Sequence, residues 1–319
     1  MPNTTTLACS SQKGGVGKTT TTLNLGAQLA LWGARVCIID FDPQGQSGTG
    51  LGLDVLPNGR TICAALTLFR LGQLTDLSGF LVDRSEMVAE AEGSGSLAVI
   101  GTNTESMDEL SDWVTGSRRD AEKAVEATTL LRRFISTCLR DYDYVLIDTP
   151  PTTNQLNALA LAASDYVIGV AESKYASFSG IVALRGQTEK VPQSTRNTCR
   201  PVFMGTLLNE TPRKESAQER HMRTLLGGQA GEQEYDEQTE DAAPEARTAL
   251  PEQATDSDSY HLFDTAIRAS ELISSAYATG RPAVLLYPNR PLAEEYSTFA
   301  QEVFARINEH RNTPEASLA

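Results

Sequence analysis

Residues 13–20, with the sequence KGGVGKTT, constrain the fold of this chain more than any other segment. They follow a short apolar run at 6–10 and precede a helical pattern that extends from 20 to 32. Glycines let backbone N–H groups curve around a polyphosphate without Cβ clashes, and the N-terminus of the next helix attracts the same anion. The order of strand, glycine-rich loop and helix therefore predicts a phosphate-binding loop.

The side chains of this loop have different expected roles. We expect Lys18 to reach the β- and γ-phosphates and the Thr19 hydroxyl to bind Mg²⁺. The general pattern G-x-x-x-x-G-K-[ST] would need glycine at position 12, where this chain has Gln12, and a second lysine, Lys13, stands early in the loop. The predicted nucleotide-binding residues of the loop are Gly14, Gly15, Val16, Gly17, Lys18, Thr19 and Thr20.

Length and composition exclude several classes of protein. The 319 residues are 40% hydrophobic, which is enough for a full core, and no run of about 18 apolar residues predicts a membrane span. A loop that begins by residue 13 leaves no room for a signal peptide, and the five scattered cysteines form no C-x-x-C pair. We therefore expect a reducing, cytoplasmic location. The net charge of −14 argues against a globally basic nucleic-acid binder, but not against a local basic patch.

The apolar segments predict an α/β fold. Buried strands are typically continuous apolar runs. The chain has such runs at 35–40, 144–148, 166–171 and 201–209, and a shorter one at 97–101. Helical patterns, including one at 128–140, separate these runs. Apart from the run at 97–101, residues 51–140 consist mostly of predicted helices and polar loops. A final amphipathic helix places Leu292, Tyr296, Phe299, Val303 and Ile307 on one face. We predict a mostly parallel, twisted sheet with helices on both faces, in a single domain over 1–319.

Two segments differ in kind from the rest. Between Gln229 and Asp258 the chain has ten acidic residues and one base, Arg247, so we expect about 227–259 to be a flexible acidic insertion. Residues 309–319 form a polar tail that contains Pro314. An ordered pattern lies between them, over 262–277 and 283–287.

Three aspartates follow two of the predicted strands. Asp40 ends the strand at 35–40, Asp42 comes two residues later, and Asp148 ends the strand at 144–148. Ligands of open parallel sheets bind at the carboxyl ends of the strands. We therefore expect Asp148 to hold Mg²⁺ in a site for phosphoryl transfer. For Asp40 and Asp42, the alternative is that they only start the turn before Pro43.

The loop at 13–20 resembles the deviant Walker A motif, K-G-G-x-G-K-[ST]-T, of the ParA/MinD (SIMIBI-class) ATPases. The segments DFDPQG at 40–45, DTPP at 148–151 and GRPAV at 280–284 also resemble segments of that family. The similarity covers roughly 6–209 and 260–308. It implies a P-loop NTPase fold, ATP and Mg²⁺ as cofactors, and the hydrolysis of ATP to ADP and phosphate.

The resemblance also implies roles for single residues. In that family the early lysine reaches across a dimer interface, so Lys13 is expected to act on the nucleotide of a partner subunit. Asp42 is expected to position or polarise the attacking water. The expected catalytic residues are therefore Lys13, Lys18 and Asp42.

The resemblance also implies residues that bind Mg²⁺ and residues that contact the adenine. Asp40 would support Mg²⁺ and the phosphate loop, which makes Thr19, Asp40 and Asp148 the expected metal set. Asn209, which ends a strand, and Pro288 are expected by positional analogy to flank the adenine. For Asn209, a plain loop role is an equal alternative.

The binding partners that the resemblance implies depend on the branch of the family. ParA-type members bind DNA non-specifically as ATP dimers and position plasmids or chromosomes, whereas MinD-type members bind membranes through a C-terminal amphipathic helix. The polar tail makes a poor membrane anchor, so we expect no membrane binding. The ParA branch implies an ATP-bound homodimer, association with the nucleoid, and a ParB-like adaptor that stimulates hydrolysis. The candidate DNA contacts are Arg213, Lys214, Arg220, Arg223 and Arg268, for which a solvated helix face is the alternative.

Two alternatives to partition stay open at this point. The chain could be a ParA-like ATPase that positions a cargo other than DNA, or a nucleotide-dependent scaffold or regulator. The role of the acidic insertion is also open. It could compete with DNA for the neighbouring arginines, or it could be a passive solvated loop.

Overall fold

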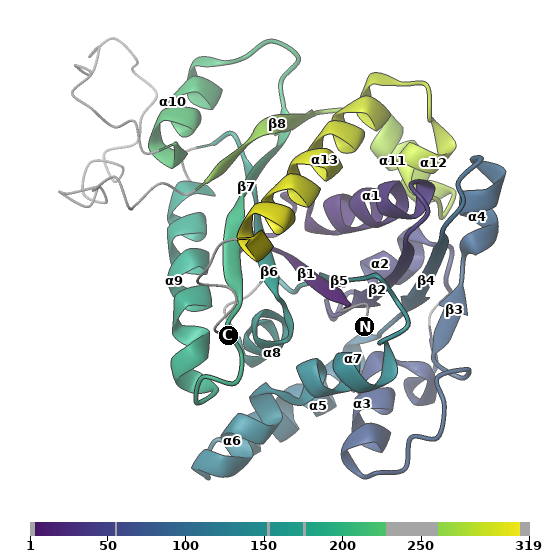
Figure 1. Ribbon diagram of the computed structural model, residues 1–319, viewed down its shortest axis with the longest axis vertical. Helices are drawn as coiled ribbons and strands as arrows, with labels where there is room; N and C mark the ends of the chain where they lie inside the picture. The colour runs from purple at the N-terminus through teal and green to yellow at the C-terminus, as the bar shows by residue number, and fades with distance from the viewer. Residues whose placement is uncertain (1–3, 55, 152–153, 175–176, 228–260, 313–319) are drawn as a thin grey trace.

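The computed structural model describes residues 4–54, 56–151, 154–174, 177–227 and 261–312 (Figure 1). The strands are β1 Thr5–Ser10, β2 Arg35–Asp40, β3 Leu81–Asp83, β4 Ser96–Ile100, β5 Tyr144–Asp148, β6 Tyr166–Glu172, β7 Val202–Thr211 and β8 Leu262–Arg268. They form one sheet in the order β3-β4-β2-β5-β1-β6-β7-β8. Every pair in it is parallel except β3 with β4.

The helices lie mostly in the connections between these strands, and the last three in the described part of the chain follow β8. They are α1 Lys18–Leu31, α2 Gln46–Gly50, α3 Ile62–Arg70, α4 Ser85–Glu90, α5 Thr104–Ser117, α6 Ala121–Thr128, α7 Leu130–Cys138, α8 Gln155–Ala163, α9 Phe178–Ser194, α10 Ala217–Leu226, α11 Glu271–Ala278, α12 Ala283–Leu286 and α13 Pro291–Asn312, with a 3₁₀ turn at Asn58–Arg60. In the described ranges, no helix combines the length and the apolar character needed to cross a lipid bilayer.

The central strands bury side chains on both faces of the sheet. Leu7 and Cys9 of β1 belong to one apolar cluster, while Ala8 between them belongs to another. The first cluster lies under α1, α12 and α13, and the second lies under α3, α5, α7 and α8. Figure 1 shows these two helical layers on opposite sides of the sheet. The predicted α/β fold, with a mostly parallel sheet covered on both faces, is confirmed.

The edge strand β8 is covered by side chains of α13. The carboxylate of Glu302 accepts hydrogen bonds from the backbone N–H groups of Asp264 and Thr265, and Glu295 accepts one from Arg268. Unpaired strand edges invite pairing with other chains, and charged side chains that bond the edge prevent it. The C-terminal helix therefore both buries its predicted apolar face and closes this end of the sheet.

Some segments differ from the sequence-based expectation or lie beyond the structure. The ordered pattern at 262–277 divides into β8 and α11, because the Ser270 side chain accepts a hydrogen bond from Leu272 N and starts a new helix. The antiparallel strand β3 was not expected within 51–140. The acidic insertion, apart from Gly227, lies outside the described residues, so its expected flexibility stays a prediction. Of the polar tail, 309–312 belong to α13 and 313–319 are not described.

Candidate functional site

The predicted site residues gather at the carboxyl end of the sheet. The loop at 11–17 leaves β1, Asp40 ends β2, Asp148 ends β5 and Glu172 ends β6. These four strands are neighbours in the order β2-β5-β1-β6. Asp40 and Asp148 are register partners on adjacent strands. The topology therefore brings together residues that lie far apart in the sequence, at the edge where open parallel sheets bind ligands.

The backbone of the phosphate loop depends on glycine. Gly15 and Gly17 have φ angles of 76° and 88°, in the left-handed region that other residues rarely adopt. A Cβ atom on Gly17 would collide with the side-chain amide of Asn209, whereas one on Gly15 would meet nothing within 4 Å. Thr21 N donates to Gly17 O, so α1 starts at this glycine. The loop is thus a tight cradle that is open on one side and leads directly into a helix N-terminus.

Lys18 lies in the first turn of α1 and is buried, with 6% of its surface exposed. Its Nζ donates to the backbone carbonyl of Lys13 at 3.4 Å, which holds the side chain over the loop. Burial lowers the pKa of Lys18, while the charges of Asp148 and Asp42 act in the opposite direction. A desolvated ammonium beside a glycine loop is well placed to attract phosphate oxygens.

Lys13 is paired with an acid at the end of β6. Its Nζ lies 2.7 Å from Oε2 of Glu172, and Lys174 Nζ lies 3.1 Å from the same oxygen. The hydrogen bond from Lys13 lowers the pKa of Glu172. Sequence reasoning missed Glu172, although an acid at the carboxyl end of a buried strand was an available signal.

The loop and β5 meet through a hydroxyl–carboxylate contact. Thr19 Oγ1 donates to Asp148 Oδ2 at 2.7 Å, and the Ser47 hydroxyl donates to the same oxygen at 2.8 Å. Oδ1 of Asp148 is buried and has no hydrogen-bond partner among the described residues. Burial raises the pKa of Asp148 to about 6, and the two hydroxyl donors oppose that rise. Sequence reasoning missed Ser47, which lies in a turn segment without a distinctive pattern.

The two aspartates around β2 are engaged with the turn that follows. Asp40 is fully buried, and its Oδ2 accepts from Gly48 N at 2.8 Å while its Oδ1 accepts from Asp42 N at 3.4 Å. Burial, reinforced by the neighbouring Asp148, raises the pKa of Asp40 well above its usual range. Asp42 Oδ1 accepts from Gln44 N at 3.0 Å. Asp40 therefore anchors α2, and its predicted support of a metal or of the phosphate loop stays a prediction.

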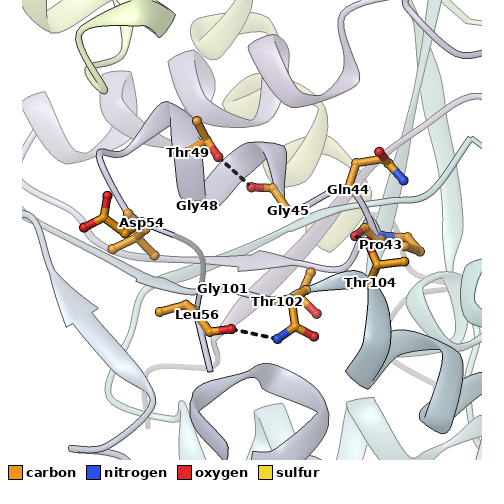
Figure 2. Close-up of a pocket in the computed structure, with 12 residues that line it drawn as sticks. Pro43, Gln44, Gly45, Gly48, Thr49, Asp54, Leu56, Gly101, Thr102 and Thr104 are labelled. Atoms are coloured by element: carbon orange, nitrogen blue, oxygen red, sulfur yellow. Dashed lines mark hydrogen bonds between the residues drawn. The ribbon is translucent and has the colours of Figure 1, made fainter. Parts of the chain in front are cut away.

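A cavity of about 150 Å³ lies beside the same turn (Figure 2). Its walls come from the loop after β2, from Gly48 and Thr49 of α2, from the segment after α2 and from the loop after β4. Thr104 Oγ1 donates to Pro43 O at 2.9 Å and ties these loops together. None of the predicted site residues lines the cavity. The cavity is therefore next to the Asp42 turn but separate from the phosphate cradle.

The two residues expected near the adenine lie in different settings. Asn209 is buried at the end of β7, and its Nδ2 donates to Val16 O at 2.8 Å. Its Oδ1 is buried without a hydrogen-bond partner in the described part of the chain. Pro288 lies in the segment between α12 and α13. Asn209 thus braces the phosphate loop from β7, and an adenine contact of either residue stays a prediction.

The structure divides the five candidate DNA contacts into two groups. Arg213, Lys214 and Arg220 are exposed before and within α10. Arg223 and Arg268 instead pair with Glu219, which is fully buried, at 3.3 and 2.9 Å. Arg268 also donates to Thr211 Oγ1 and Pro212 O. Because these two guanidinium groups join β8 to α10, the structure gives them a structural role that the sequence did not indicate.

The sequence of the chain is similar to those of known proteins. A family model described as an AAA domain matches residues 4–200 of the chain. The chromosome partitioning protein ParA of Caulobacter vibrioides is 28% identical over 304 residues, which cover 94% of each chain. The chromosome-partitioning ATPase Soj of Thermus thermophilus is 29% identical over 307 residues, which cover 95% of this chain and 96% of Soj.

A solved structure shares the fold at lower identity. Cobyrinic acid a,c-diamide synthase from Mycobacterium smegmatis, with a bound ATP analogue and magnesium, superposes with a TM-score of 0.66 at 22% identity. The superposition covers 98% of each chain. This likeness concerns the fold alone.

Proposed function

Because the chain belongs to the AAA-domain family of ParA- and MinD-like P-loop ATPases, we propose that it is a ParA-type ATPase that uses ATP hydrolysis for plasmid or chromosome partition. The contact from Thr19 to Asp148, directly below a glycine cradle, carries the proposal. It joins a hydroxyl and a carboxylate at the N-terminus of the helix that follows the loop. Oxygen ligands of this kind are the ones that Mg²⁺ uses when it binds together with a nucleotide.

The residues at the loop fit Mg²⁺ and ATP. Thr19 and Asp148 would hold the metal, and the unpartnered Oδ1 of Asp148 is a buried acceptor in need of a donor or a cation. The described residues include no group of three or more His, Cys, Asp or Glu side chains able to hold a metal by themselves. Mg²⁺ binds with few protein ligands and completes its shell with water and phosphate oxygens. When bound, Mg²⁺ would neutralise negative charge on the phosphates.

The other residues position the reacting groups. The loop has backbone amides at Gly14, Gly15 and Gly17 that can donate to phosphate oxygens, and a Cβ at Gly14 or Gly15 would meet nothing within 4 Å. Lys18 would add a fixed positive charge, and the Asp42 carboxylate would accept a hydrogen bond from the attacking water. Phosphoryl transfer depends mainly on such positioning and on charge stabilisation. These cis contributions leave room for a group from a second subunit.

Lys13 is our candidate for that group. Its side chain is 41% exposed, outside its own cradle, so a second copy could receive it. A homodimer with ATP at the interface would then hydrolyse ATP faster than the monomer, and a ParB-like adaptor would stimulate it further. The exposed Arg213, Lys214 and Arg220 would contact DNA phosphates, and the ATP-bound dimer would associate with the nucleoid.

One experiment separates this proposal from its alternatives. We would measure binding to non-specific duplex DNA with ATP, with ADP and without nucleotide, at two salt concentrations, for the wild type and for Lys13→Ala. We expect binding only with ATP, weakened by salt and abolished by the substitution. Dimerisation with ATP but without DNA binding would reject partition and indicate a positioning ATPase for another cargo or a nucleotide-dependent scaffold. Failure to bind ATP at all would overturn the ATPase proposal itself.

A further inference from the structure

The five-residue helix α2 contacts both of the acids that end β2 and β5. Gly48 N donates to Asp40 Oδ2 at 2.8 Å, and the neighbouring Ser47 hydroxyl donates to Asp148 Oδ2 at 2.8 Å. We infer that Ser47 is a positioning residue that fixes the orientation of the Asp148 carboxylate for a divalent cation. This inference rests on the proposed function of the site.

The two hydroxyl donors to Asp148 differ in what they can do. Thr19 belongs to the phosphate loop, and its hydroxyl is the expected metal ligand, so it would turn from Asp148 to the metal when the metal binds. Ser47 is not part of the loop. Its hydroxyl is then the donor that stays on Oδ2 and prevents the carboxylate from rotating. Oδ1, which has no partner among the described residues, then stays available to a cation.

Ser47 can act in this way because its own position is fixed. It is fully buried, with no exposed surface. Besides the bond from Gly48 to Asp40, α2 is held from a distant segment, because the Tyr277 hydroxyl of α11 donates to Gln46 O at 3.1 Å. A donor on such a support loses little freedom when it bonds the carboxylate, which is how residues behind the metal ligands tune metal affinity.

Thr49 provides a matched comparison on the same helix. It lies two residues after Ser47, but its hydroxyl donates to Gly45 O of its own turn at 3.3 Å, and it faces the cavity shown in Figure 2. Removal of this hydroxyl would disturb α2 without changing the Asp148 carboxylate. Thr49→Ala therefore reports on the helix, while Ser47→Ala reports on the helix and on the contact to Asp148.

The test measures the Mg²⁺ requirement of nucleotide binding in the full chain. A fluorescent, non-hydrolysable ATP analogue is bound first in EDTA and then over a titration of MgCl₂. For Ser47→Ala we expect the half-saturating Mg²⁺ concentration to rise about tenfold, with affinity in EDTA unchanged. For Thr49→Ala we expect the wild-type value. If Ser47→Ala is unfolded, Ser47→Cys, whose thiol is a weak donor, should give a smaller rise in the same direction.

The outcomes distinguish the inference from the proposed function. Wild-type Mg²⁺ dependence in Ser47→Ala, or in Ser47→Cys where the alanine variant is unfolded, overturns the positioning role. An equal loss of affinity in EDTA and in Mg²⁺ also overturns it, because it would indicate a structural role only. If the wild type binds the analogue without any Mg²⁺ dependence, or does not bind it, the proposed metal-dependent ATPase fails.

Discussion

Lys13 and Glu172 form an ion pair within one chain, with 2.7 Å between Nζ and Oε2. The first lysine of the phosphate loop is thus held by the end of β6, three strands away from Asp40 in the sheet. If Lys13 acts on the nucleotide of a second subunit, as proposed, it must leave Glu172 first. The pair then opposes dimerisation by the small free energy of a half-exposed ion pair, about 1 kcal/mol or less.

Substitution of Glu172 should release Lys13. In Glu172→Gln the side chain keeps its shape but loses its charge, so we expect dimerisation with a non-hydrolysable ATP analogue at about two- to fivefold lower protein concentration. Sedimentation velocity over a concentration series measures this shift. Glu90→Gln is the control, because it breaks the Arg281–Glu90 pair, an exposed ion pair at 2.6 Å outside the site. Weaker dimerisation of Glu172→Gln would mean that Glu172 supports the dimer.

The loop should not tolerate a side chain at Gly17. Alanine there would combine a left-handed backbone, which costs about 1–2 kcal/mol, with a collision against the Asn209 amide. We expect Gly17→Ala to lower nucleotide affinity at least tenfold, measured by isothermal titration calorimetry. The control is Gly116→Ala on the exposed face of α5, where a Cβ meets nothing within 4 Å. That variant should bind normally and be at least as stable as the wild type, because alanine favours a helix more than glycine does. Unchanged binding by Gly17→Ala would contradict the cradle geometry.

The strands that carry the site could be predicted because they are continuous apolar runs. Residues 36–40 and 145–148 are buried on both faces of the sheet, so every position is apolar until the terminal aspartate. The glycine loop could be predicted for a similar reason, since positive φ angles at Gly15 and Gly17 restrict those positions to glycine. In both cases a local requirement, burial or a positive φ angle, restricts the residue types at neighbouring positions.

The missed residues act through contacts between distant segments. Ser47 and Asp148 are separated by 101 positions, and Lys13 and Glu172 by 159. A serine in a turn and an acid after a strand are common, and only the order of the strands makes them neighbours. The same reason explains Arg268, a candidate DNA contact in the sequence, because no local pattern contains its pairing with Glu219.

Asp148 predicts a pH dependence of stability in the nucleotide-free protein. Its folded pKa of about 6 lies above the ordinary value of 3.8, so the folded state retains a proton that the unfolded chain releases between about pH 4 and 6. The stabilising contribution is complete below pH 4 and is lost as the pH rises through 6. The difference between the folded and the ordinary pKa corresponds to about 3 kcal/mol of stability below pH 4.

Asp148→Asn tests this dependence, because its side chain stays neutral. We expect the variant to be more stable than the wild type at pH 7.5 and the difference to shrink toward pH 4.5, measured by urea unfolding in EDTA. Burial still raises the pKa of Asp40 in the variant, but the contribution of the Asp148 charge to that pKa is lost, so the comparison reports on the coupled pair of aspartates. A stability difference independent of pH would show that Asp148 does not titrate in this range.

The two groups of arginines should respond differently to alanine. Under the proposed function, Arg220→Ala removes one phosphate contact, so ATP-dependent DNA binding should weaken several-fold and the slope of log K against log salt should fall by about one. Arg268→Ala instead leaves the buried Glu219 carboxylate with a single partner, Arg223, and should destabilise the fold by about 3 kcal/mol. Fluorescence anisotropy with duplex DNA and urea unfolding measure the two effects. If Arg268→Ala left stability unchanged but lowered the salt slope, its guanidinium would contact DNA after all, and the Glu219 pairing would not be its main role.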